Sequence, residues 1–257
     1  MRYIPIEKTE QDMILARSVY DNTGRVLLSC GTVLTDEYID KLYERGLPGI
    51  YIEDKLAEDI EIEEAISEEL RNEGAEALRN GDVDAAMSVG RRIVDEIIQN
   101  PRVTLDLIDL RSYDDYTYRH SVNVAVISTV IGINMQLNRL ALDELSIAAI
   151  LHDIGKRRID PKIINKKGKL TPEEYTEVKR HSEYGYEMVK SRIDLSAKIK
   201  NAILLHHENE DGSGYPKGLK GNQIFIYAKI IHVADVFDAL TAKRPYKKAY
   251  AQSEAAE

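Results

Sequence analysis

Five of the six histidines in this chain lie on the apolar faces of expected helices: His120, His152, His181, His206 and His207. His120, for example, precedes Val124, Ile127 and Ile131 by four, seven and eleven residues, which places all four on one helical face. A buried imidazole needs a hydrogen-bond partner or a metal ion, because burying a polar group alone is costly. The histidines therefore predict one of two arrangements. Each buried imidazole has its own hydrogen-bond partner, or several of them bind one metal centre.

Two carboxylates accompany these imidazoles. Asp153 follows His152 directly, and Asp235 lies near Ile231 and Asp238 on a late helix. One metal centre explains five imidazoles and two carboxylates more simply than separate hydrogen-bonding arrangements in one helical core. Neutral imidazole and carboxylate are ligands of iron, manganese and zinc, and the lack of cysteine ligands argues against a structural zinc site. We expect His232 to be a packed or hydrogen-bonded histidine and no ligand.

The same residues belong to an ordered set of short motifs at residues 120–125, 151–156, 181, 206–208, 211–216, 234–241 and 244–247. This set resembles the HD-GYP branch of the HD phosphohydrolase superfamily over about residues 110–250. The pair His152-Asp153 alone would be a weak signal, but the ordered set is specific. The loop Gly214-Tyr215-Pro216 separates it from the wider superfamily.

The resemblance implies a helical domain that binds two divalent metal ions, iron or manganese, with the identity left open. It places one ion among His120, His152, Asp153 and Asp235. It places the other among His181, His206, His207 and the same Asp153.

The resemblance also implies the residues that meet the substrate. Lys156 is expected to face the scissile phosphate and, with Asp153, to take part in catalysis. The remaining substrate contacts are expected from Gly214, Tyr215, Pro216, Arg244 and Lys247.

One position departs from some family members, which carry a glutamate one turn before the first histidine that supports a third metal. This chain has Tyr116 there. A neutral phenol is a poor ligand near pH 7, because its pKa is about 10. The sequence therefore predicts two metal ions.

The function that the resemblance implies is hydrolysis of cyclic di-GMP to linear pGpG, GMP or both, in bacterial second-messenger signalling. Two alternatives stay open. One is a non-catalytic receptor for cyclic di-GMP, against which the complete ligand set argues. The other is an HD hydrolase that acts on another cyclic dinucleotide.

Composition sets limits on these functions. The chain has 257 residues, and its net charge of −9 argues against binding of DNA or RNA polymers. Basic residues nevertheless gather at residues 156–169 and 243–248, where they favour a local anionic ligand. The apolar runs are too short for a membrane span, and the N-terminus lacks a secretory signal, so we expect a cytoplasmic protein. We expect Cys30 to be a small packed side chain without a function.

The sequence predicts three parts, of which the last carries the site. Residues 1–54 are expected to form a small α+β module, with a hairpin of residues 25–29 and 32–34, a helix over residues 36–45 and a closing strand at residues 49–53. Residues 55–100 are expected to form a helical connector that turns at Asn80-Gly81-Asp82. Residues 101–257 are expected to form the mainly α HD-GYP domain. A packing or oligomerisation role for the first module leaves a homodimer open, and the helix-like residues 253–257 suggest a chain that continues.

Overall fold

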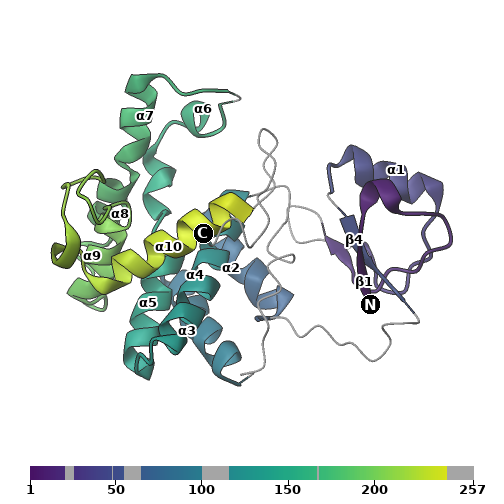
Figure 1. Ribbon diagram of the computed structural model, residues 1–257, viewed down its shortest axis with the longest axis horizontal. Helices are drawn as coiled ribbons and strands as arrows, with labels where there is room; N and C mark the ends of the chain where they lie inside the picture. The colour runs from purple at the N-terminus through teal and green to yellow at the C-terminus, as the bar shows by residue number, and fades with distance from the viewer. Residues whose placement is uncertain (21–25, 48, 55–64, 100–115, 167, 242–257) are drawn as a thin grey trace.

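The computed structural model describes residues 1–20, 26–47, 49–54, 65–99, 116–166 and 168–241 (Figure 1). It contains a small α+β unit near the N-terminus and a larger unit built of helices. Their buried side chains form separate apolar clusters, one around Leu15 and Leu34 and the other around Leu145 and Ile203. The mainly α architecture with a small α+β module agrees with the prediction from the sequence.

The N-terminal unit is organised by two short antiparallel sheets. Strand β1 (Arg2–Pro5) pairs with β4 (Gly49–Ile52), and β2 (Val19–Tyr20) pairs with β3 (Val26–Leu28). The short helices η1 (Ile6–Lys8) and α1 (Asp36–Glu44) complete it. Thr35 caps α1 by accepting a hydrogen bond from the Tyr38 backbone N–H. The expected helix and the expected closing strand are therefore confirmed.

Two sequence predictions in this unit are wrong. The turn at Cys30-Gly31 exists, but β3 pairs with β2, while Val33 forms an isolated bridge with Ile14. Alternation of apolar residues indicates a strand but not its partner, so the predicted pairing of residues 25–29 with residues 32–34 is wrong. Cys30 is exposed at this turn, where its thiol donates to the Ala16 carbonyl at 3.2 Å.

The helical unit runs from residue 65 to residue 241. Its longer helices are α2 (Glu68–Asn80), α3 (Val83–Gln99), α4 (Tyr116–Asn134), α5 (Arg139–Leu151), α7 (Pro172–Lys179), α8 (His181–Val189), α9 (Ala197–Leu205) and α10 (Ile226–Thr241). Among the described residues, three short helices lie between them: η3 (Ile154–Arg158), α6 (Pro161–Ile164) and η4 (Gly221–Gln223).

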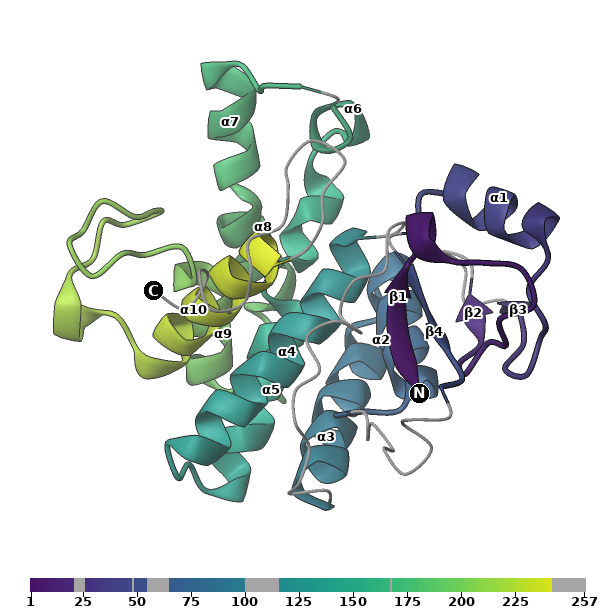
Figure 2. The ribbon, with the colours of Figure 1, turned by 45° about the vertical axis from the view of Figure 1, so that its right-hand side comes forward.

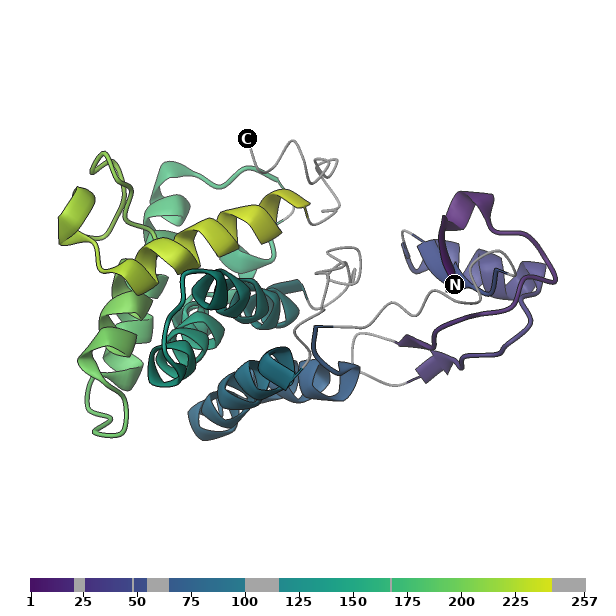
Figure 3. The same ribbon diagram turned by 60° about the horizontal axis from the view of Figure 1, so that its bottom comes forward.

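Helix α4 lies at the centre of this unit and contacts α2, α5 and α10. Figures 2 and 3 show α10 on one side of α4 and the pair α2 and α3 on another. Helices α8 and α9 pack against each other, and α9 also contacts α5 and α10. The ends of α5 and α9 and the start of α8 are thereby brought close to α4 and α10.

The two connector helices pack into the same core as the histidine-bearing helices. They turn at Gly81, whose φ of 72° lies in the left-handed region that favours glycine. Leu70 on α2 and Ile93 on α3 are fully buried and join the cluster that contains Val122 of α4. The predicted pair of helices and their turn are confirmed. Their apolar faces pack against the apolar core of the helical unit.

Candidate metal centre

The predicted imidazoles and carboxylates converge in the helical unit. They come from α4, the end of α5, the start of α8, the end of α9, and α10. Their ligand atoms form two groups, and within each group these atoms all lie within 4.8 Å of one another. The first group is Asp153, His181, His206 and His207, and the second is His120, His152 and Asp235.

Helix ends fix the orientation of three of these imidazoles. His152 and His206 follow the last residues of α5 and α9, and His181 is the first residue of α8. Their Nδ1 atoms lie 2.7, 2.8 and 2.7 Å from the backbone carbonyl oxygen three residues earlier. An Nδ1–H that donates to a carbonyl leaves a lone pair on Nε2, the form that binds a metal. These three lone pairs belong to the two groups of ligand atoms.

Several contacts within the cluster are unfavourable unless a cation is present. The Nε2 atoms of His181 and His206 lie 3.2 Å apart, so their lone pairs face each other. Among the described residues, the buried atoms His152 Nε2 and Asp153 Oδ1 find no hydrogen-bond partner. Buried polar atoms are nearly always satisfied, and exceptions call for an explanation. The donor set therefore fits divalent metal ions.

Asp153 links the two groups. Its Oδ1 lies 3.3 Å from Nε2 of His181, while its Oδ2 lies 3.3 Å from Nε2 of His152 and 3.9 Å from Nε2 of His120. The two oxygens of one carboxylate thus face different imidazole groups. This arrangement suits a carboxylate that bridges two ions.

His120 is held between two carboxylates of α10. Its Nδ1 donates to Asp238 Oδ2 at 2.6 Å, and its Nε2 lies 3.0 Å from Asp235 Oδ1. Asp238 also accepts a hydrogen bond from the Asn123 amide at 3.1 Å. In the sequence, Asp238 stands three residues after Asp235, and no role is predicted for it. Its orienting role could have been inferred from the three-residue spacing, which places both acids on one helical face.

The charges of these groups follow from burial and from each other. Burial lowers the pKa values of His181 and His206, and lowers that of His207 to about 3, so these rings are neutral near pH 7. Burial alone would lower the pKa of His120, but hydrogen bonds to Asp235 and Asp238 raise it to about 9. The raised pKa shows that Asp235 and Asp238 favour positive charge at the position of His120.

Both candidate ligand carboxylates are ionised. Burial alone would raise the pKa of Asp153, but electrostatic interactions with the neighbouring His152 and Lys156 hold it well below its usual range. Burial likewise opposes ionisation of Asp235, yet its hydrogen bond with His120 lowers the pKa of this carboxyl below its ordinary value. Neutral imidazoles and ionised carboxylates are the forms in which these side chains bind metals.

Gly155 allows Asp153 to approach His181. A Cβ atom on Gly155 would lie 1.9 Å from the His181 carbonyl oxygen and 2.4 Å from the Gly185 backbone nitrogen. Only glycine permits η3 to pack this closely on α8. Asp153 and His181 are twenty-eight positions apart in the sequence. The close contact between Gly155 and α8 brings the segments that carry them together.

The residues Thr171-Pro172-Glu173-Glu174 predict a capping box and a helix that continues through His181. The capping box exists, with Glu174 as its second member, but the helix is divided at Arg180 into α7 and α8. The single-helix prediction is therefore wrong at that residue. The division places His181 in a first helical turn, from which its ring reaches back to the Val178 carbonyl.

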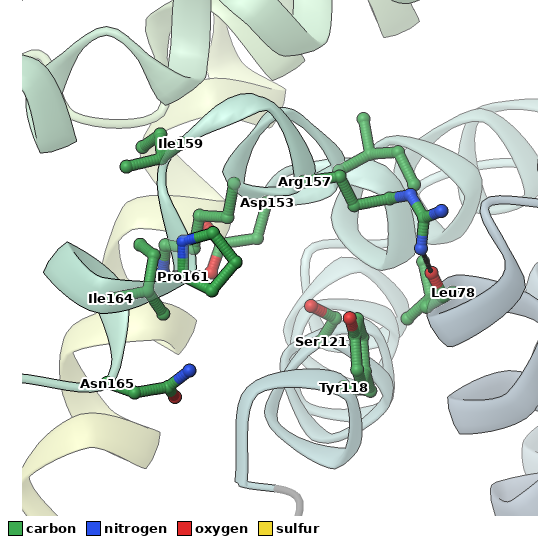
Figure 4. Close-up of a pocket in the computed structure, with 11 residues that line it drawn as sticks. Leu78, Tyr118, Ser121, Asp153, Arg157, Ile159, Pro161, Ile164 and Asn165 are labelled. Carbon is green, nitrogen blue, oxygen red and sulfur yellow. Dashed lines mark hydrogen bonds and ion pairs between the residues drawn. The ribbon is translucent and has the colours of Figure 1, made fainter.

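A cavity of about 410 Å³ opens beside Asp153 (Figure 4). Tyr118 and Ser121 of α4 line one side, and Pro161 and Ile164 line the other. Lys156 also lines the cavity and forms an ion pair with Asp153. The structure therefore places both predicted catalytic residues at one opening.

The loop that contains Gly214, Tyr215 and Pro216 lies against the first ligand group. The ring of Tyr215 stacks on His207 at a centroid distance of 4.7 Å. Buried Glu208 holds this loop, since its carboxylate accepts hydrogen bonds from the backbone N–H groups of Lys217 and Leu219 at 2.7 and 2.8 Å. Burial raises the pKa of Tyr215, so it remains a neutral phenol.

His232 belongs to neither group of ligand atoms. The ring of His232 donates to the His206 backbone carbonyl at 2.8 Å, which confirms it as a hydrogen-bonded histidine. Arg244, Lys247 and the side chain of Tyr116 lie outside the described residues.

Comparison with known proteins supports this description. A family model described as an HD domain matches residues 102–257. A cyclic di-GMP phosphodiesterase of Pseudomonas aeruginosa is 40% identical over 167 residues, which are 63% of this chain and 40% of that protein. A cyclic di-GMP phosphodiesterase of Thermotoga maritima is 41% identical over 149 residues, 56% of this chain and 40% of that protein. The chain thus spans about two fifths of the length of these curated relatives.

Two further relatives broaden the comparison. A 3′3′-cGAMP-specific phosphodiesterase of Vibrio cholerae is 37% identical over 143 residues, 56% of this chain and 30% of that protein. The solved structure of an HDG"Y"P protein from Bdellovibrio bacteriovorus matches 99% of this chain and 91% of its own chain, with a TM-score of 0.60 and 19% identity. At that identity the structural match supports the fold alone.

Proposed function

The chain belongs to the HD-domain family, and from this membership we propose that it is a metal-dependent phosphodiesterase that hydrolyses cyclic di-GMP. The observation that carries the proposal is the position of the Asp153 carboxylate between two groups of histidines. The relatives named as cyclic di-GMP phosphodiesterases support the choice of substrate. The Gly-Tyr-Pro loop expected of the HD-GYP branch lies beside the cluster.

We propose two metal ions, iron or manganese. One would be held by His120, His152, Asp153 and Asp235, and the other by His181, His206, His207 and the shared Asp153. Two divalent ions in such a site lower the pKa of a bound water, orient it for in-line attack and neutralise charge on the phosphate. Asp153 keeps both sets of ligands together, and Asp238 orients His120.

The reaction requires no side-chain nucleophile. The oxygen of a water molecule forms a bond to phosphorus, the bond from phosphorus to the ribose 3′ oxygen breaks, and a proton passes to that oxygen. Lys156 would stabilise the charge that develops on the phosphate oxygens, since its ammonium lies at the cavity beside Asp153. The first product is linear pGpG, and a second cut would give GMP.

The remaining substrate contacts are proposed from two segments of the sequence, residues 214–216 and residues 244–247. Gly214, Tyr215 and Pro216 would meet a nucleotide, because the Tyr215 ring already lies on His207. Arg244 and Lys247 would bind the phosphate that is not cut. Among the described residues no helix is both long and apolar enough to cross a membrane. A cytoplasmic location and a homodimer remain predictions.

A second substrate is supported by one observation, the similarity to 3′3′-cGAMP-specific phosphodiesterases of Vibrio cholerae. A test offers the Mn²⁺-loaded chain equal concentrations of cyclic di-GMP, 3′3′-cGAMP and cyclic di-AMP, with products separated by chromatography. We expect the highest kcat/KM for cyclic di-GMP. A higher value for 3′3′-cGAMP would replace the substrate but keep the reaction, and no hydrolysis of any of the three would favour a non-catalytic receptor.

A further inference from the structure

Buried polar contacts connect helix α2 to the candidate ligand His120. Arg71 of α2 donates to Asn123 Oδ1 at 2.9 Å, and the Asn123 amide donates to Asp238 Oδ1 at 3.1 Å. The other oxygen of Asp238 accepts the Nδ1–H of His120 at 2.6 Å. All four residues are at most 4% exposed. The connection thus runs through the interior from α2, across α4, to α10 and back to His120.

The donors and acceptors along this connection orient one another in order, from Arg71 through Asn123 and Asp238 to His120. The Asn123 amide uses its oxygen toward Arg71 and its nitrogen toward Asp238, so the guanidinium determines which way the amide is turned. Asp238 then receives two donors and stays oriented toward the His120 ring. A carboxylate that accepts from Nδ1 fixes the ring and strengthens the lone pair on Nε2.

Arg71 is itself held in place on α2. Its Nε lies 3.2 Å from Glu68 Oε2, and the other oxygen of Glu68 pairs with Arg119 at 2.9 Å. Arg119 also donates to Asn72. Because a guanidinium is a rigid planar fork, these contacts leave Arg71 little freedom to turn away from Asn123.

The other end of α2 contacts the site as well. Arg157, which follows Lys156 in η3, donates to the backbone carbonyls of Leu78 and Arg79 at the end of α2, the first at 3.2 Å. Figure 4 shows the Arg157 guanidinium turned toward Leu78. A displacement of α2 would therefore reach both His120 and the segment that carries Asp153 and Lys156.

We propose that Arg71 is a positioning residue through which α2 controls the orientation of His120 and the affinity of the centre for its metal. Arg71 lies before residues 102–257, which the HD-domain model matches. The connector helix of this chain is therefore part of the machinery that holds the metal. This inference rests on the metal site of the proposed function.

The test compares Mn²⁺ affinity in full-length variants. Arg71→Met removes the donor and keeps most of the side-chain volume, and Arg71→Lys restores a positive donor without the fork. The control is Ser146→Ala, which removes a buried 2.8 Å hydrogen bond between α5 and the Gly90 carbonyl of α3. Affinity is measured by competition with a fluorescent chelator, and the melting temperature of each variant is recorded without metal and with Mn²⁺.

We expect Arg71→Met to weaken Mn²⁺ binding on the order of 3- to 10-fold, less than the roughly 10- to 100-fold loss of direct outer-shell changes, because Arg71 acts on His120 through Asn123 and Asp238. Its Mn²⁺-induced rise in melting temperature should shrink accordingly. Arg71→Lys should recover part of the affinity. Ser146→Ala should lower the metal-free melting temperature and leave Mn²⁺ affinity at the wild-type value.

A second pair of variants tests the path itself. Asn123→Ala should weaken Mn²⁺ binding, and adding Arg71→Met to it should cause little further loss, because both changes break one connection.

Unchanged affinity in both Arg71 variants would overturn the inference, as would equal weakening in Ser146→Ala or fully additive losses in the double variant. If Arg71→Met does not fold without metal, the Mn²⁺ affinities of Arg71→Lys and Asn123→Ala decide whether the inference holds. A wild-type chain that binds neither Mn²⁺ nor Fe²⁺ would instead overturn the proposed function, and the positioning role with it.

Discussion

Asp153→Ala is expected to remove metal and hydrolysis together. The carboxylate faces ligands of both groups, at 3.3 Å from Nε2 of His152 and 3.3 Å from Nε2 of His181. Without it, the imidazoles of the two groups have no shared negative charge between them. Metal ions contribute several kcal/mol to transition-state stabilisation, so we expect the rate to fall by about 1,000-fold or more.

The measurement is metal content and hydrolysis rate on the same sample. Asp143→Ala is a matched control, because Asp143 lies on α5, the helix that ends just before His152 and Asp153, but pairs at the surface with Arg139 at 2.9 Å. Surface pairs contribute little to stability, so this variant should keep its metal and its rate. Normal metal content with full activity in Asp153→Ala would show that the carboxylate does not link two ions.

Lys156→Met is expected to lower kcat about 100-fold and to leave the metal in place. Lys156 lines the cavity and pairs with Asp153, so its charge is available to a phosphate held there. Removing a cation next to Asp153 does not weaken the attraction of that carboxylate for metal ions. The variant should therefore show full metal content and a low saturating rate.

Kinetics at saturating substrate, with metal analysis, test the role of Lys156. The exposed Lys162 of the adjacent helix α6 provides a comparison, and Lys162→Met should keep the wild-type kcat. If Lys156→Met raises KM and leaves kcat unchanged, the ammonium contributes to binding and not to the chemical step.

The ligand cluster could be predicted because each histidine stands among apolar residues at helical spacing. Such local periodicity indicates that His120 and His152 face the core. The order of the motifs then predicts which residues contribute to one metal centre. The contacts between distant elements were beyond this reasoning. The pairing of β3 with β2, the orienting role of Asp238 and the connection from Arg71 each depend on how separate elements pack together.

Local chemistry also explains the smaller errors. The division of α7 from α8 at Arg180 falls in a stretch without glycine or proline, so no breaker residue announces it. The exposure of Cys30 follows from its place in a turn, whereas residue type alone favours burial. By contrast, the turn at Gly81 and the capping box at Thr171 carried clear signals and were predicted correctly.

Titration of the metal-free chain with Mn²⁺, while cyclic di-GMP hydrolysis and bound metal are followed together, tests the central claim most directly. The account predicts no hydrolysis without metal and a rate that reaches its plateau at two ions per chain. Rapid hydrolysis by the metal-free chain, or a plateau that requires a third tightly bound ion, would contradict it.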